Sequence, residues 1–326
     1  MKRFICTICT MGMVSVFAIV ATISGVPRET LAATLSLGHN QPIGAEWDQI
    51  AKRFAEEVSK NSKGELKVEV FPAESLGKSI EIIEGTMMGT QQLFMDAASM
   101  FEAVFEPISV FALPFLFRND EHLLGVGNGP VGKEIFEEMR KKTGLRVIGV
   151  YLFAPRQLTT KVSITKPEQV KGLKIRVPEI PIFVSTWKAL GARPTPISAS
   201  ELYTSLATGI VDAQENPFSV IFAFKLYEVL KYCNLTSHVQ MPGILVMNDK
   251  FFSGLSAPMQ EIIMRSGSEA MKWGNELVTR NQNELKGKLS DKGMLFTNPD
   301  RKAFAEATQD VYEEFIKKGK FTRNTV

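Results

Sequence analysis

Hydrophobic and polar residues follow one another along the chain with two different periods, and these periods predict a succession of strands and helices. A period of two is typical of strands, and three- and four-residue steps are typical of an amphipathic helix. From the N-terminal side, the pattern predicts strands at 34–40, 65–72 and 91–99, with helices at 44–64 and 78–90 between them. This alternation of strand and helix predicts a parallel sheet covered by helices.

Downstream, the pattern predicts further strands and one unusually long helix. The strands are at 145–153, 172–181, 210–217 and 238–248. Two short helices are expected at capping boxes, formed by Thr165 with Glu168 and by Ser198 with Glu201. The helical pattern is almost uninterrupted at 257–290. At 1.5 Å per residue such a helix is roughly 50 Å long, so it could lie across two domains.

The strand at 172–181 carries an arginine on the face opposite its apolar residues. The apolar positions alternate with Lys174 and Arg176, which therefore point to the other face, and Pro178 then ends the pairing. The arginine is either a solvated charge on an edge strand or a fixed charge that binds a ligand. Its planar guanidinium donates two parallel hydrogen bonds, which suit a carboxylate.

Other polar residues lie near predicted strand ends, and ligands of parallel α/β sheets bind beyond the carboxyl ends of strands. Arg156 is expected just past the end of the strand at 145–153. The remaining candidates for ligand contact are His39, Asn40, Asp96, Ser99, Glu215 and Asn216. Each also fits an ordinary role, such as a turn asparagine, a packed histidine or a salt-bridged arginine. Periodicity and spacing alone therefore predict an α/β protein with a candidate anion site.

Composition and charge argue against several classes of protein. The chain has 326 residues, 44% hydrophobic and 22% charged, which suits a soluble globular protein of two ordinary domains. A formal net charge of +3 without a basic block argues against nucleic acid as a partner. The three histidines have no metal-ligand spacing, and we expect neither a metal nor another cofactor.

Motifs of enzymes are scarce. The sequence has no nucleophile elbow and no phosphate-binding loop. The rival interpretation, an exported hydrolase, would depend on a carboxylate in a cleft, such as Asp96 or Glu215.

The first 33 residues have the order of a secretory signal. Two basic residues precede an uncharged stretch at 4–26, and small residues follow at Ala32 and Ala33. The apolar stretch is also long enough to span a bilayer, so two outcomes stay open: cleavage near Ala32 or Ala33, or an uncleaved anchor. Cleavage would leave 35 basic and 34 acidic residues, and a single cysteine, Cys233, which excludes an internal disulfide.

Two sequence blocks carry a resemblance to a known family. The first, KGLKIRVP at 171–178, contains Arg176, and the second is GARPTPISASELYTSLATGIVDAQENP at 191–217. At this separation the blocks resemble the substrate-binding proteins of TRAP transporters, which are the periplasmic, DctP-type subunits of ion-driven uptake systems. The resemblance runs from LGHN at 37–40 to the C-terminus, so it covers essentially the whole mature chain.

The resemblance implies a two-domain periplasmic binding protein (class II-like), with a mixed sheet flanked by helices in each domain and a long helix crossing both. The implied domains are discontinuous: 34–153 with about 242–281, and 154–241 with about 282–326, around a ligand cleft. The implied ligand residues are Arg176, which pairs with the ligand carboxylate, Arg156 as a second arginine, Asn216 of the QENP block and, less specifically, Asn40.

The resemblance also implies a function: capture of a small organic acid anion and its delivery to the small and large membrane subunits of a TRAP transporter. The protein would be a monomer in the periplasm, exported by the Sec route, and not an enzyme. A binding module of an ABC importer or of a membrane sensor is a further alternative.

The blocks limit the ligand without identifying it. Ala199 stands where relatives often have an aromatic residue that packs on the ligand. The QENP block differs from that of relatives that bind a metal beside the ligand. Hydroxy acids, sugar acids and four-carbon dicarboxylates stay open, with a preference for a monocarboxylate that carries hydroxyl groups.

Overall fold

Strands β1, β2 and β3 form a parallel unit at one end of the sheet. The computed structural model describes residues 33–325. β1 (Ala33–Gly38) lies between β2 (Leu66–Phe71) and β3 (Leu93–Ala97) and is parallel to both. Helices α1 (Glu46–Asn61) and α2 (Ser79–Met88) make the two crossovers. The strand–helix order and the parallel pairing predicted for this part of the chain are confirmed.

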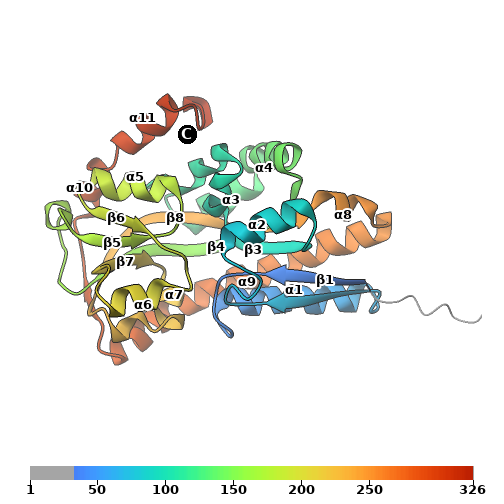
Figure 1. Cartoon of the computed structure of the whole chain (residues 1–326), viewed down its shortest axis with the longest axis horizontal. Helices are drawn as coiled ribbons and strands as arrows, with labels where there is room; N and C mark the ends of the chain where they lie inside the picture. Colours follow the sequence, from blue (N-terminus) through green and yellow to red (C-terminus); the bar gives the residue numbers. More distant parts are fainter. Residues whose placement is uncertain (1–32, 326) are drawn as a thin grey trace, which may run out of the picture. The chain divides into compact units, whose positions relative to one another are not determined.

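Two long antiparallel strands, β4 (Leu145–Thr160) and β8 (Tyr232–Asn248), join this unit to the rest of the sheet (Figure 1). The strand order is β2-β1-β3-β8-β4-β7-β5-β6, with β9 also on β8. The short strands are β5 (Lys174–Val177), β6 (Arg193–Pro196), β7 (Ala213–Asn216) and β9 (Leu295–Thr297). β7, β5 and β6 are mutually parallel, whereas β4 is antiparallel to β7 and β8. The predicted mixed sheet is therefore confirmed.

The remaining helices lie between these strands or, in the case of α10, α11 and η5, after the last strand. They are η1 (Ala98–Ala103), η2 (Glu106–Ala112), α3 (Asp120–Asn128), α4 (Pro130–Thr143), η3 (Pro167–Val170), α5 (Pro181–Ala189), α6 (Leu202–Ala207), α7 (Phe218–Ala223), η4 (Leu226–Glu228), α8 (Asp249–Gly254), α10 (Arg301–Glu306), α11 (Asp310–Lys317) and η5 (Arg323–Thr325).

The two predicted capping boxes are not formed as expected. Before η3, the side-chain oxygen of Gln169 accepts from the backbone N–H groups of Thr165 and Lys166, so Gln169 takes the place predicted for Glu168. The hydroxyl of Ser198 donates to Glu201 Oε2 at 2.6 Å, but α6 begins only after this pair.

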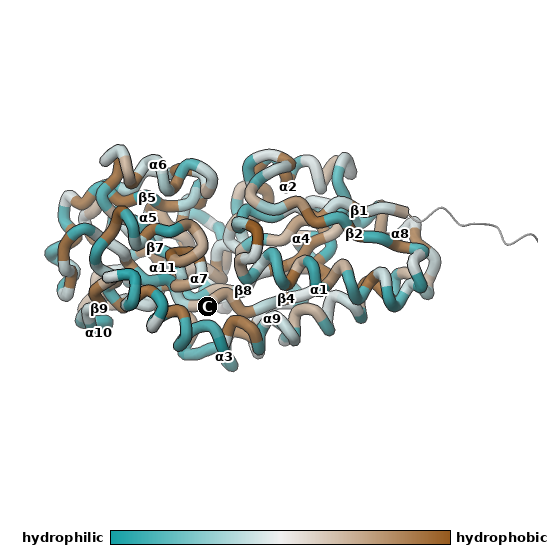
Figure 2. The backbone as a smooth tube through the Cα atoms, turned by 90° about the horizontal axis from the view of Figure 1, so that it is seen from below, coloured by the Kyte–Doolittle hydropathy of each residue, from teal (hydrophilic) through white to brown (hydrophobic). Residues whose placement is uncertain are grey.

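Helix α9 (Ala257–Asp291) is one continuous helix of 35 residues, as the sequence pattern predicts. It packs on α1 and β4, and Figure 1 shows α3 and α4 on the other side of β4. Hydrophilic and hydrophobic turns alternate along α9 (Figure 2). A methyl group placed on Gly267 would come 2.6 Å from Cγ2 of Ile148 and 2.8 Å from its carbonyl oxygen. Because the carbonyl is backbone and cannot swing away, the close packing of α9 on β4 requires glycine here.

Within residues 33–325 the buried apolar side chains form two clusters. The larger one includes Trp187 and most apolar residues of the central strands, and the smaller one surrounds α6 and α7. Helix α9 contributes Val278 to the larger cluster and Leu285 and Leu289 to the smaller one. A single helix therefore stabilises both cores.

The predicted signal segment, residues 1–33, lies outside the described residues except for its last position. Among the residues that are described, none of the helices is long and apolar enough to cross a membrane.

The packing of α9 gives a matched pair of glycine substitutions in one helix. Gly267→Ala should lower the free energy of unfolding by about 1–3 kcal/mol because it overpacks the contact with β4. Gly287→Ala should be neutral or raise it by up to about 1 kcal/mol, because a methyl group there meets no atom within 4 Å and alanine favours the helix. Equilibrium urea unfolding measures both values, and a Gly267→Ala protein as stable as wild type would contradict the packing described.

Candidate ligand-binding site

A pocket lies beside the ends of β1, β3, β5 and β7, and both apolar and polar side chains line it, as is usual for a small-molecule site. Its charged lining residues are Glu74, Asp96, Arg156, Arg176 and Glu179. Six of the eight residues predicted from the sequence line it, namely Asn40, Asp96, Ser99, Arg156, Arg176 and Asn216. The other two, His39 and Glu215, lie buried behind its wall. The fold thus gathers residues that are far apart in the sequence, whereas their roles toward a ligand remain predictions.

Arg156 lies inside β4, so the prediction that it follows the end of the strand is wrong. The register of β4 against β8 shifts on both sides of Arg156, after Phe153 and before Leu158. On β8, Ser237 has a left-handed backbone with φ 42°. β-bulges change the direction in which side chains point, and they are common next to active sites. The strict alternation of apolar residues stops at this irregularity, but the pairing of the strands continues beyond it.

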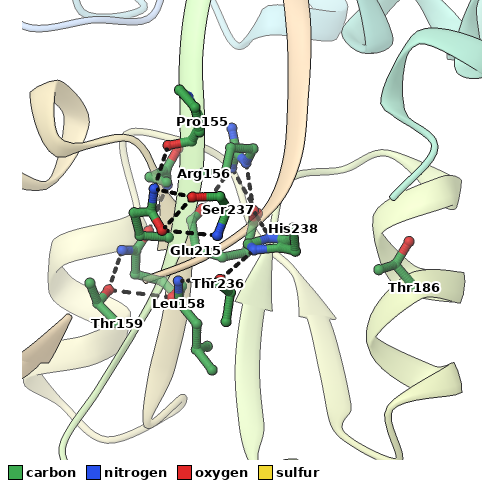
Figure 3. A network of polar contacts seen from close by, with 12 residues as sticks. Pro155, Arg156, Leu158, Thr159, Thr186, Glu215, Thr236, Ser237 and His238 are labelled. Atoms are coloured by element: carbon green, nitrogen blue, oxygen red, sulfur yellow. Dashed lines mark hydrogen bonds and ion pairs between the residues drawn. The ribbon is translucent and has the colours of Figure 1, made fainter. Parts of the chain in front are cut away.

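These irregularities bring Arg156, Glu215 and His238 into one buried network (Figure 3). Arg156 Nε donates to Glu215 Oε2 at 2.5 Å, and Nη2 donates to Oε1 at 2.7 Å and to the Glu215 carbonyl oxygen at 2.6 Å. His238 Nε2 lies 3.0 Å from the same Oε2. The ring of Phe183 lies 5.0 Å from the guanidinium carbon. The positive charge of Arg156 is therefore already balanced within the protein.

The hydrogen bonds around His238 indicate which protons the network holds. Thr236 Oγ1 accepts from the backbone N–H of Leu158 and lies 2.8 Å from His238 Nδ1, so its own proton can go to Nδ1. The ring then keeps its proton on Nε2 and donates to Glu215. Burial lowers the pKa of His238, and the nearby Glu215 offsets this only in part, which favours the neutral ring. Burial acts to raise the pKa of Glu215, but Arg156 and His238 outweigh it and lower that pKa.

Arg176 differs from Arg156 because it has no carboxylate partner among residues 33–325. It is 5% exposed, and its Nε donates to the carbonyl oxygen of Ile197 at 2.8 Å. Its two terminal nitrogens donate to no other described residue. Burial, and then the nearby charge of Arg156, lower the pKa of Arg176 to about 10. The face of β5 that carries Arg176 is therefore the pocket wall and not solvent.

Another part of the wall is built around Asp96 at the end of β3. Its Oδ2 accepts from Asn40 Nδ2 at 2.9 Å and from the hydroxyl of Ser79 at 3.0 Å, and its Oδ1 accepts from the backbone N–H of Ala97. Burial raises the pKa of Asp96 to about 7, although two of these hydrogen bonds oppose the shift. The nearby carboxylate of Glu74 raises it further. The charge of Asp96 therefore changes close to neutral pH.

Two contacts join loops that are distant in sequence and that both border the pocket. The backbone N–H of Ser200 donates to Glu74 Oε2 at 3.1 Å, and Lys78 Nζ lies 3.3 Å from Glu201 Oε1. Ala73 and Glu74 both have a left-handed backbone, with φ 55° and 58°, and their N–H groups donate to carbonyl oxygens just after β1. Glu74 and Glu179 were not predicted from the sequence, because an acidic residue in a polar turn gives no signal that it faces a pocket.

The remaining predicted residues have structural bonds of their own. His39 is fully buried, and its Nε2 lies 3.6 Å from Asp48 Oδ1, so it supports the segment after β1 and does not line the pocket. Ser99 is fully buried and reaches the pocket wall. Asn216 Nδ2 donates to Gln214 Oε1 at 2.6 Å, which leaves its second N–H for another acceptor.

Comparison with known proteins gives the family. Residues 37–318 match the family described as bacterial extracellular solute-binding protein, family 7 (DctP). The chain belongs to this family. The resemblance seen in the sequence and the predicted fold class are both confirmed. The members are solute-binding proteins, which disfavours the hydrolase interpretation.

Three relatives show how similar the chain is to characterised members of this family. A TRAP periplasmic solute-binding protein from Roseobacter denitrificans with bound L-galactonate is 35% identical, with a TM-score of 0.83 over 89% of this chain and 98% of that chain. One from Bordetella bronchispeptica, with density interpreted as pantoate, is 30% identical, with a TM-score of 0.86 over 90% and 97%. The 2,3-diketo-L-gulonate-binding periplasmic protein of Escherichia coli is 32% identical over 302 residues, 91% of this chain and 92% of that protein.

The buried pair of Arg156 and Glu215 can be tested with a double-mutant cycle. Glu215→Leu should lower the free energy of unfolding by about 3–5 kcal/mol, because it leaves a buried guanidinium uncompensated. Arg156→Met with Glu215→Leu should cost much less than the two single changes added together. Glu306→Gln, which removes an exposed charge pair, should change stability by less than about 0.5 kcal/mol and serves as the control. Additive effects in urea unfolding would contradict the pairing.

Asp96 gives a prediction about pH. Its pKa is raised in the folded state, from 3.8 to about 7, so its contribution to stability is full below pH 3.8 and is lost as the pH rises through 7. Between pH 5 and pH 8, wild type should lose about 2–3 kcal/mol relative to Asp96→Asn, which cannot ionise. Urea unfolding of both ligand-free proteins at the two pH values measures the difference, and parallel pH profiles would show that Asp96 is not buried as described.

Proposed function

We propose that this protein captures a small organic acid anion and delivers it to the membrane subunits of a TRAP transporter. The observation that carries this proposal is Arg176, a buried guanidinium on the pocket wall without a carboxylate partner among the described residues. A buried charge without a partner is costly, and an anionic ligand would remove that cost. The pocket is therefore suited to a carboxylate at this position.

The hydrogen bonds already made leave particular N–H groups available for a ligand carboxylate. Because Arg176 Nε is bonded to Ile197, a ligand carboxylate would meet the two terminal nitrogens of the guanidinium. Arg156 offers only Nη1, since its Nε and Nη2 bind Glu215. Arg156 and the second N–H of Asn216 would thus orient the carboxylate, and Arg176 would neutralise it.

The ligands of the relatives support this class of compound. L-galactonate is bound in one relative, pantoate was interpreted in the density of another, and the third is named for 2,3-diketo-L-gulonate. Each of these acids carries one carboxylate and several oxygen atoms that can hydrogen-bond.

Ligand capture would involve two domains that close on the pocket. The division expected from the sequence is 34–153 with about 242–281, and 154–241 with about 282–326, and pocket residues come from both sets. The contacts of Glu74 with Ser200 and of Lys78 with Glu201 join the two sets. A ligand that contacts both domains would favour the closed arrangement by its extra contacts there.

The place of action would be the periplasm. The relatives described above are periplasmic proteins. Residues 1–33 have the order of a secretory signal, and we expect Sec export with cleavage near Ala32 or Ala33. The small and large membrane subunits of the transporter would be the protein partners of the loaded monomer.

The role of Arg176 can be measured by ligand binding. A thermal-shift screen with L-galactonate, pantoate and 2,3-diketo-L-gulonate would select a ligand, because a compound that binds only the folded state raises its stability. Arg176→Ala should then weaken binding by about 30- to several-thousand-fold in isothermal titration calorimetry, since a buried charge partner is lost. Lys174→Ala, an exposed change on the same strand, should leave affinity unchanged. An Arg176→Ala affinity within about threefold of wild type would contradict the assigned role.

A further inference from the structure

The pocket lining has more carboxylates than cations that are free to bind a ligand. Two arginines line it, but Arg156 is neutralised by Glu215, so Arg176 is the cation left to a ligand among the residues described. Three carboxylates also line the pocket: Glu74, Asp96 and Glu179. The pocket therefore has a positive charge to offer to one carboxylate, and it has none left for a second.

Two of these carboxylates are at least partly removed from solvent and line the same pocket. Asp96 is 2% exposed and Glu74 is half-buried, whereas Glu179 is exposed and more strongly screened by water. Glu74 raises the pKa of Asp96, as expected for neighbouring carboxyl groups. We call Glu74 and Asp96 together the acidic wall.

The acidic wall can still accept hydrogen bonds. A carboxylate has about four lone-pair sites. Asp96 already accepts from Asn40, Ser79 and Ala97, but Glu74 accepts from Ser200 alone among the described residues. Glu74 therefore has the larger capacity for ligand hydroxyl groups, and the hydrogen bond from its backbone N–H to the carbonyl oxygen of His39 holds it near the end of β1.

We propose that the acidic wall, chiefly Glu74, restricts the pocket to monocarboxylates that carry hydroxyl groups and excludes dicarboxylates of the same length. This inference deepens the proposed function, since it depends on Arg176 binding the first carboxylate. A hydroxyl group of the ligand donates to the wall. A second carboxylate on the ligand faces the like charge of the wall without a free cation among the pocket-lining residues, and such an arrangement is unfavourable.

The experiment compares acids that differ only at the far carbon. L-galactonate and galactarate, D-gluconate and D-glucarate, and D-erythronate and meso-tartrate are three such pairs, in which a terminal CH₂OH is replaced by a carboxylate. Isothermal titration calorimetry at pH 8 measures both members of each pair with wild type, Glu74→Gln and Glu84→Gln. Glutamine keeps an oxygen that can accept from Ser200 N–H, so Glu74→Gln removes the charge and not the contact. Glu84 is an exposed acidic residue of α2 outside the pocket lining and is the matched control.

For every pair in which either acid binds, wild type should prefer the monocarboxylate by about a hundredfold or more. Glu74→Gln should reduce that preference by about tenfold or more, mainly by tighter binding of the dicarboxylate, whereas Glu84→Gln should leave it unchanged. Equal or tighter binding of dicarboxylates to wild type, or an unchanged preference in Glu74→Gln, would overturn the acidic wall and leave the proposed function intact. If no acid of either kind binds wild type, the result contradicts both the proposed function and the proposed role of the acidic wall.

Discussion

The candidate site depends on the difference between two buried arginines. Both guanidinium groups are removed from water, and such a charge is costly unless a partner replaces the lost solvation. Glu215 replaces it for Arg156, while Arg176 has no such carboxylate among the described residues. If both arginines were paired within the protein, an anion would gain little by entering. If neither were paired, the empty pocket would hold two neighbouring uncompensated charges and would destabilise the fold.

The long strands β4 and β8 make this arrangement possible. Regular strands would turn alternate side chains to opposite faces of the sheet, but the register of these two strands shifts around Arg156. The same region of β8 supplies His238, which contacts Glu215, and Thr236, which contacts the His238 ring. Glu215 comes from β7, which pairs with β4, so the register shifts around Arg156 bring together side chains of three strands. The continuous strands also connect the parallel unit of β1, β2 and β3 to the rest of the sheet, and α9 packs along β4 through its glycine contact.

Sequence patterns predicted part of the regular structure. Alternation and apolar runs located every strand except the short β6 and β9, although the prediction ended β4 at 153 and began β8 at 238. The uninterrupted pattern at 257–290 matches α9 almost residue for residue, whereas several helices, such as α3, α4, α10 and α11, were not predicted. The alternation in β5 correctly placed Arg176 on the face opposite the apolar residues. These features are local, because they depend on which face of one element is buried.

Features that depend on distant residues could not be predicted in the same way. The position of Arg156 inside a strand was missed, since a bulge interrupts the alternation that marks a strand in sequence. Glu74 and Glu179 gave no signal, because their importance comes from lying at the same pocket as Arg176 and not from any pattern of neighbours. Glu215 was expected to contact the ligand, but the structure shows that its bonds go to Arg156 and His238. The sequence could name polar residues near strand ends, but it could not say which charges neutralise one another.

The selectivity of the pocket depends on which of its charges are already neutralised within the protein. With more carboxylates than free cations on its wall, the pocket cannot attract anions by net charge alone. If a ligand binds as proposed, its affinity comes from the placement of one carboxylate at Arg176 and of hydrogen-bond donors at the acidic wall. Hydrogen bonds depend on distance and direction more steeply than charge attraction does, so a ligand with its polar groups in other positions would leave buried groups unpaired. In the proposed binding mode, discrimination among acids arises from the cost of those unpaired groups, and closure of the two domains would increase that cost by excluding water.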